Sequence, residues 1–132
     1  MKKKLFLAGT LFALLSVIAG AFGSHALKKV LMPEDLTAYE TAVRYQMYHA
    51  LAILFTGLYL DESDAARTGK FSARAGIFFT AGIIFFSGSL YLITFFKVMN
   101  SSVPYLIGIA TPLGGIMFVC GWIMLAFSIF KK

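Results

Sequence analysis

The chain has 132 residues, of which 59% are hydrophobic and 14% are charged, and its mean hydropathy is +0.81. Soluble domains contain about 45 to 50% apolar and about 25% charged residues, so this composition excludes an ordinary soluble fold. The net charge is +6, but the basic residues lie in twos and threes beside apolar runs, which indicates the flanks of membrane spans and not a nucleic-acid-binding face. We therefore expect one all-α membrane domain over residues 1–132, embedded in membrane lipids.

The first predicted span covers about residues 5–25. Its apolar part, residues 5–22, contains no charged side chain, and about 20 such residues cross the roughly 30 Å hydrocarbon layer as a helix. The preceding lysines and the Ala-Gly-Ala sequence at 19–21 are also typical of a cleavable secretory signal. We expect the span to be retained, because its apolar run is at the long end for a signal peptide.

The second predicted span, about residues 41–60, is the least hydrophobic of the four. Only residues 47–60 are mainly apolar, so the helix must extend back through Arg44 and Gln46 to reach the length of a span. Pro33 suits the first position of a helix, and the two acidic residues after it suit the first turn, where the helix dipole favours negative charge. We predict one long helix that begins before the bilayer and continues into it.

The third and fourth predicted spans are strongly apolar and cover about residues 74–96 and 103–130. A polar segment followed by a proline, residues 100–104, predicts the turn between them. Small residues recur in the first and last spans, and such residues allow membrane helices to approach closely. We predict that four glycines form a helix-packing motif, or alternatively a homo-oligomer contact: Gly20, Gly23, Gly114 and Gly115.

The distribution of Lys and Arg predicts the orientation of this four-helix bundle. Eight of the twelve basic residues lie on one side of the predicted membrane and four on the other, and the richer side is normally cytoplasmic. Both termini are therefore expected in the cytoplasm. The eight are Lys2, Lys3, Lys4, Arg67, Lys70, Arg74, Lys131 and Lys132.

Polar residues that enter the membrane are concentrated in the outer half of the second span. Ionisable residues within a span are expensive, roughly 2.5 to 3.5 kcal/mol for a central Arg, so they usually face protein or water and are candidates for function. Helical spacing divides these residues into columns. One column contains Glu40, Arg44 and Tyr48, the next contains Tyr45 and His49, and Gln46 lies three residues before His49.

The ionisable members of this group have both a structural and a functional interpretation. Arg44 is expected at the outer interface, paired with Glu40 and directed toward the headgroups. His49 lies deeper, as a neutral imidazole bonded to a neighbouring helix, or as a proton acceptor or ligand-binding group. His25 lies on the same side and could approach His49. Two histidines and one cysteine are too few for a metal site, and we find no cofactor-binding or catalytic motif, so we expect neither metal nor cofactor.

Two segments carry a resemblance to a known family: Gly20-Ala21-Phe22-Gly23-Ser24-His25-Ala26-Leu27, and Thr41-Ala42-Val43-Arg44-Tyr45-Gln46-Met47-Tyr48-His49-Ala50-Leu51-Ala52. The chain resembles, over its whole length, the uncharacterised bacterial inner-membrane family built on domain of unknown function 423, also called uncharacterised protein family 0382. That family is similar to the eukaryotic transmembrane protein 256. Ser24 departs from the pattern, in which alanine is frequent.

The resemblance implies a four-span protein of the bacterial plasma membrane, but it implies no activity. It also argues against cleavage of the first span, because the first motif runs through the cleavage point. The motif positions that it implies are Gly20, Gly23, His25, Arg44, Tyr45, Gln46 and His49.

Three functions follow from these observations. We favour a non-enzymatic accessory protein, in which the polar residues fix helix packing and bind a lipid headgroup or a partner membrane protein. The alternatives are a small transporter or channel with an outward-facing polar pocket, and a membrane enzyme acting on a lipid or quinone with His49 as base. Transport or catalysis requires His25, Arg44 and His49 to face one cavity, whereas a structural role places them against neighbouring groups of the protein.

Overall fold

The computed structural model describes residues 1–60 and 69–130, and this part of the chain is helical without a β-strand. The four predicted helices are confirmed. The third is made of three consecutive segments, because a π-helical turn interrupts it. The elements are α1 (Lys2–His25), the short 3-10 helix η1 (Leu27–Lys29), α2 (Pro33–Tyr59), α3 (Gly69–Gly82), the π-helical η2 (Ile83–Ser87), α4 (Gly88–Val98) and α5 (Tyr105–Phe130).

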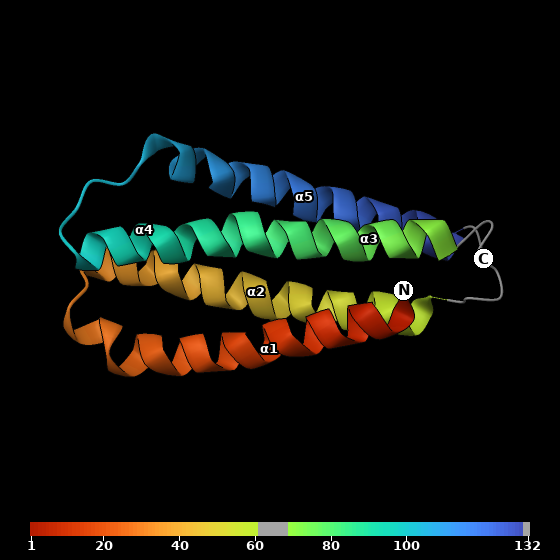
Figure 1. Cartoon of the computed structure of the whole chain (residues 1–132), viewed down its shortest axis with the longest axis horizontal. Helices are drawn as coiled ribbons and strands as arrows, with labels where there is room; N and C mark the ends of the chain where they lie inside the picture. Colours follow the sequence, from red (N-terminus) through yellow and green to blue (C-terminus); the bar gives the residue numbers. More distant parts are fainter. Residues whose placement is uncertain (61–68, 131–132) are drawn as a thin grey trace.

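The helices run antiparallel, with α2 between α1 and the continuous α3–η2–α4 helix (Figure 1). α1 packs mainly against α2, and α5 packs mainly against α3 on the far side of the bundle. The first turn of α1 and the last turn of α5 lie at the same end of the molecule (Figure 1). The bundle thus resembles a curved layer in which α2 and α3–η2–α4 are the two central helices.

Three helical stretches of the described chain are long and apolar enough to cross a membrane: Lys2–Lys29, Gly69–Val98 and Tyr105–Phe130. α2 has the required length of 27 residues but a lower hydropathy, as its polar outer half predicts. It lies alongside α1 on one side and α3–η2–α4 on the other, so many of its polar groups meet protein instead of lipid. This central position accounts for a less apolar helix within a membrane bundle.

The predicted start of the second helix is confirmed. α2 begins with Pro33 in its first turn, followed by Glu34 and Asp35, and continues without interruption to Tyr59. Proline suits this place because the first N–H groups of a helix have no partner within the helix. Arg67, Lys131 and Lys132, on which the predicted orientation partly depends, lie outside the described residues.

Large apolar side chains fill the half of the bundle nearer the termini. Ile53 of α2 and Phe79 of α3 have no exposed surface, and Phe118 and Leu125 of α5 are almost as deeply buried. Leu5 joins the same cluster from the first turn of α1. This core holds together the ends of the four helices that lie nearer the termini.

The four predicted packing glycines differ in their surroundings. A β-carbon added at Gly23 would lie 2.6 Å from the ring of Tyr39, and one added at Gly114 would collide with the backbone of Phe86. Because glycine has no side chain, the neighbouring helices can approach closely at these two positions. At Gly20 the nearest atom would be a methyl group of Val43 at 3.4 Å, an ordinary contact. A β-carbon added at Gly115 would have no atom within 4 Å, so Gly115 makes no close contact with another helix of the same chain, and its role in a homo-oligomer contact stays a prediction.

We expect Gly114→Ala to lower the free energy of unfolding in detergent micelles by about 1 to 3 kcal/mol, because the methyl group would push α5 away from the η2 backbone. Gly115→Ala adds the same methyl group to open space and should change it by less than about 0.5 kcal/mol. Unfolding curves of the two variants test this contrast, and equal effects would contradict the assignment of the packing face.

The orientation remains a prediction, and two reporters test it. A green fluorescent protein fused after residue 132 should fluoresce and an alkaline phosphatase fused there should be inactive, because the excess of basic residues places the termini in the cytoplasm. Active phosphatase and a dark fluorescent fusion would show the opposite orientation.

Candidate functional site

The polar residues of α2 meet three different surroundings. Gln46 contacts α1 and α4, while His49 contacts α3 and α5. Tyr45 is partly exposed and its ring stacks on Phe86 of η2, whereas three residues are exposed at the surface without an aromatic contact to another helix: Glu40, Arg44 and Tyr48. The group that the sequence presents as one cluster is therefore divided among separate neighbours.

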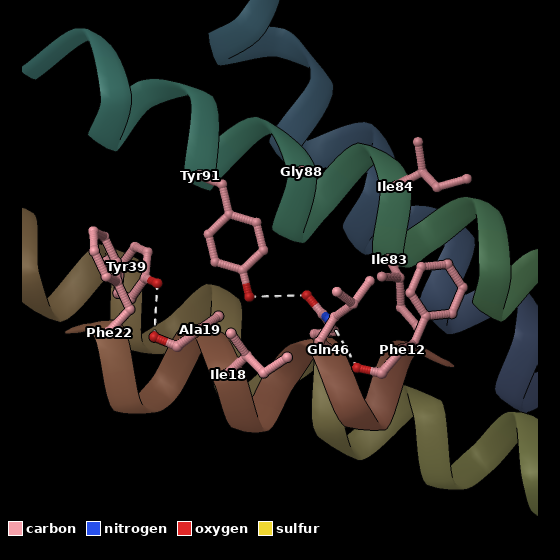
Figure 2. A pocket seen from close by; sticks show the side chains of 11 residues that line it. Phe12, Ile18, Ala19, Phe22, Tyr39, Gln46, Ile83, Ile84, Gly88 and Tyr91 are labelled. Carbon is pink, nitrogen blue, oxygen red and sulfur yellow. Dashed lines mark hydrogen bonds between the residues drawn. The ribbon is translucent and has the colours of Figure 1, made fainter. Parts of the chain in front are cut away.

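Gln46 connects three helices through its side-chain amide. Its Nε2 atom donates a hydrogen bond of 2.8 Å to the backbone carbonyl of Phe12 in α1, and its Oε1 atom accepts one of 2.9 Å from the hydroxyl of Tyr91 in α4 (Figure 2). The side chain is buried. Because an unpaired buried amide is costly, these two bonds fix the lateral position of α2 between its neighbours.

Similar hydrogen bonds from side chain to backbone join α2 to its neighbours along its length. The Ser16 hydroxyl of α1 donates to the carbonyl of Val43 at 2.8 Å. The Tyr39 hydroxyl donates in the opposite direction, to the carbonyl of Ala19 at 2.7 Å (Figure 2). Such bonds join two backbones without needing a second polar side chain.

The same type of bond reaches α2 from the other flank. The Ser87 hydroxyl at the end of η2 donates to the carbonyl of Ala42 at 2.8 Å, and both residues are fully buried. α2 is therefore bonded through its backbone carbonyls to both of the helices beside it.

His49 is enclosed by aromatic side chains. Its ring lies parallel to that of Phe118 in α5, with centroids 3.5 Å apart and planes 6° apart, and Phe79 lies on another side. The Trp122 indole Nε1 lies 3.3 Å from Nε2, and Nδ1 lies 2.8 Å from the carbonyl of Tyr45. An indole nitrogen only donates, so Nε2 accepts and Nδ1 carries the hydrogen, which makes this imidazole neutral with both nitrogens paired.

Arg44 does not form the predicted ion pair with Glu40. Its Nη2 atom instead donates to the hydroxyl of Thr41 at 3.2 Å, and both Arg44 and Glu40 are exposed. Across residues 1–60 and 69–130 the one ion pair joins Lys97 to Asp35 at 3.7 Å. An exposed ion pair contributes little free energy, so the prediction from spacing alone was weak.

His25 and His49 are far apart, contrary to the predicted approach. His25 is exposed at the end of α1, where its Nδ1 atom lies 3.0 Å from the carbonyl of Ala21. Gln46, one turn before His49, lies opposite Phe12. About 13 residues of helix, or ~20 Å, separate Phe12 from His25. The spacing could not reveal this, because it depends on how the two helices are aligned.

Two hollows border the N-terminal half of α2. A small pocket of about 200 Å³ includes Glu40 and Arg44 among its lining residues. A larger groove of about 540 Å³ lies between α1 and α4 and has Gln46, Tyr39 and Tyr91 on its lining (Figure 2). Neither hollow is lined by a histidine. Within the described parts of the chain, no three His, Cys, Asp or Glu side chains are grouped to hold a metal ion.

Several partners of the polar residues were absent from the predicted cluster. Tyr39 follows the same face of α2 as Gln46, seven residues before it, and a tyrosine inside an apolar span such as Tyr91 needs a partner for its hydroxyl. The helix face of Tyr39 and the position of the Tyr91 hydroxyl within an apolar span could have identified these two residues as members of the site. Trp122 of α5, which is half exposed, donates to His49.

Four antiparallel helices, three of them apolar enough to span, and a polar central helix define a class: small multi-pass proteins of the cell membrane. The family model described as protein of unknown function (DUF423) matches residues 19–115. The chain belongs to this family.

Similar proteins of known sequence have nearly the same length and are named as membrane proteins. The UPF0382 membrane protein SAB0533 of Staphylococcus aureus is 40% identical over 97% of both chains. The UPF0382 membrane protein YwdK of Bacillus subtilis is 34% identical over 98% of both chains, and a UPF0382 membrane protein of Haemophilus influenzae is 36% identical over all of this chain and 98% of its own. No solved structure matches the chain.

A double-mutant cycle tests the bond between Gln46 and Tyr91. Gln46→Leu and Tyr91→Phe should each destabilise the bundle, and the pair should show a coupling energy of about 0.6 kcal/mol, with about 1.7 kcal/mol as the upper end for such bonds in membrane proteins. Reversible unfolding in detergent micelles measures the coupling. A coupling indistinguishable from zero would show that the two side chains do not bond.

Proposed function

We propose that this protein is a non-enzymatic accessory protein of the cell membrane. In this role the polar residues of α2 hold the helices in a fixed arrangement, and the outer surface of the bundle binds a lipid or a partner membrane protein. The observation that carries the proposal is that Gln46 and His49, although only three residues apart, bond to different helices, Gln46 to α1 and α4 and His49 to α5.

Both residues have the partners expected of structural groups. The amide of Gln46 bonds to a backbone carbonyl and a hydroxyl, and both nitrogens of His49 are paired while its ring is stacked on Phe118. A general base needs a lone pair within reach of a substrate. In His49 the acceptor nitrogen faces Trp122 instead, which favours a packing role.

The alternative functions need a shared pocket. A transporter with an outward-facing site would bring His25, Arg44 and His49 together, but the first two are exposed and the third is buried against α5. The small pocket beside Arg44 is bordered by Glu40 but not by either histidine. The geometry supports the accessory role better than transport or catalysis.

Replacement of His49 distinguishes a structural role from a chemical one. We expect His49→Phe to keep the contact with Phe118 and to rescue a deletion strain about as well as the unmodified protein, since a phenyl ring also stacks. His49→Ala should leave a cavity beside Phe118 and Trp122, lower the free energy of unfolding by about 2 to 4 kcal/mol and reduce the amount of folded protein in the membrane.

The measurements are deletion rescue and the amount of monodisperse protein extracted from membranes. Tyr48→Phe is the control, because Tyr48 is exposed one residue before His49 on the same helix. A His49→Phe protein that accumulates normally but fails to rescue would contradict the structural role and favour a proton-accepting or ligand-binding one.

A further inference from the structure

The larger groove opens sideways, toward the surroundings of the bundle. α2 forms its floor, and its two walls are α1 and the η2–α4 segment, which do not pack along one another (Figure 2). One wall carries Phe12 and Ile18, and the other carries Ile84 and Gly88. The groove has a volume of about 540 Å³.

The walls of this groove are apolar and lie within the membrane-spanning parts of α1 and α4. Its polar groups are already used, since Gln46 bonds to Phe12 and Tyr91, and Tyr39 bonds to Ala19. An apolar groove at this depth is filled more favourably by a hydrocarbon chain than by water. The chemistry of the lining thus matches an acyl chain.

Positive charge lies beyond the outer end of the groove. Phe22 lines that end, α1 ends one turn later at His25, and the next element, η1, carries Lys28 and Lys29. Both lysines are exposed and neither has an ion pair within the described residues, whereas Lys97 is paired with Asp35. Two unpaired lysines beside an apolar groove complement a phosphate attached to a hydrocarbon chain.

We propose that the groove binds one acyl chain of an anionic phospholipid, with the phosphate against Lys28 and Lys29. This proposal rests on the proposed accessory function and specifies its lipid. The chain lies between α1 and η2–α4 over the Gln46–Tyr91 hydrogen bond, and the headgroup lies at the outer end, near η1.

Native mass spectrometry of the full chain, released from detergent, tests lipid retention. The protein is incubated with phosphatidylglycerol or with phosphatidylcholine carrying the same acyl chains, and phosphatidylglycerol should be retained preferentially. Gly88→Leu should lower its retention about tenfold, because the new side chain would displace roughly two methylene groups of the lipid from the groove. There is room for it, since the nearest atom to an added β-carbon is the Ile83 carbonyl oxygen at 4.0 Å.

Gly115→Leu is the matched control, because it makes the same change in open space on α5 and should leave retention unchanged. If Gly88→Leu does not fold, Ile84→Trp replaces it. Ile84 lies on the same wall and is 57% exposed, and Ile116→Trp on α5, at 61% exposed, is its control.

The headgroup is tested separately. A double variant, Lys28→Gln with Lys29→Gln, should reduce the preference for phosphatidylglycerol over phosphatidylcholine. The expected reduction is about fivefold or more for each lysine, because one basic residue near an anionic surface contributes about 1 kcal/mol. Lys3→Gln with Lys4→Gln, at the other end of α1, should not reduce it.

Equal retention of the two lipids would overturn the proposal, as would equal effects of Gly88→Leu and Gly115→Leu. A dimer that Gly88→Leu dissociates would also overturn it, by showing that a second copy fills the groove. None of these variants alters Gln46 or His49, so failure here leaves the proposed role of the polar residues to its own test by deletion rescue.

Discussion

In the hydrocarbon layer there is no water to bond to, so each polar group of a spanning helix needs a partner within the protein. α2 is where this constraint is most demanding, because it carries an amide and an imidazole at membrane depth. Both are buried and fully paired, the amide between α1 and α4 and the imidazole against α5. The central position of α2 follows, since only a helix with neighbours on several sides can pair groups that point in several directions.

The other helices are adapted to this arrangement in different ways. α1 offers backbone carbonyls and one serine, while η2 brings Ser87 to the backbone of α2. α5 offers aromatic rings, of which Phe118 stacks on His49. The close approach of α5 to η2 depends on Gly114. Polar bonds therefore position the half of the bundle away from the termini, and apolar packing around Phe79 contributes most of the core in the half nearer the termini.

The sequence predicts the fold well because apolar length and helix-start residues are local properties. All four helices, the early start at Pro33 and the exceptional character of α2 follow from them. Helical spacing also separates the exposed column of Arg44 from that of His49. The spacing cannot specify which helix each column meets, so the approach of the two histidines was predicted wrongly. The Arg44–Glu40 pair was also wrong, because both side chains are exposed, where an ion pair contributes little free energy.

The sequence also could not predict the hydrogen-bond partners of the candidate site. Gln46 was identified as part of a polar cluster, but its partners, a backbone carbonyl of Phe12 and the hydroxyl of Tyr91, lie 34 and 45 residues away in the chain. A carbonyl group has no signature in the sequence, since every residue has one. Only the alignment of helices in space reveals that this cluster joins separate interfaces.

The hydrogen bonds between α1 and α2 also bear on how the protein is made. Translation delivers α1 to the membrane first, so the carbonyls of Phe12 and Ala19 are in place when the polar half of α2 follows. α2 can then leave water as the second arm of a hairpin, with the Nε2 atom of Gln46 and the hydroxyl of Tyr39 already bonded to α1. The least hydrophobic helix of the bundle is thereby synthesised directly after the one that makes its insertion favourable.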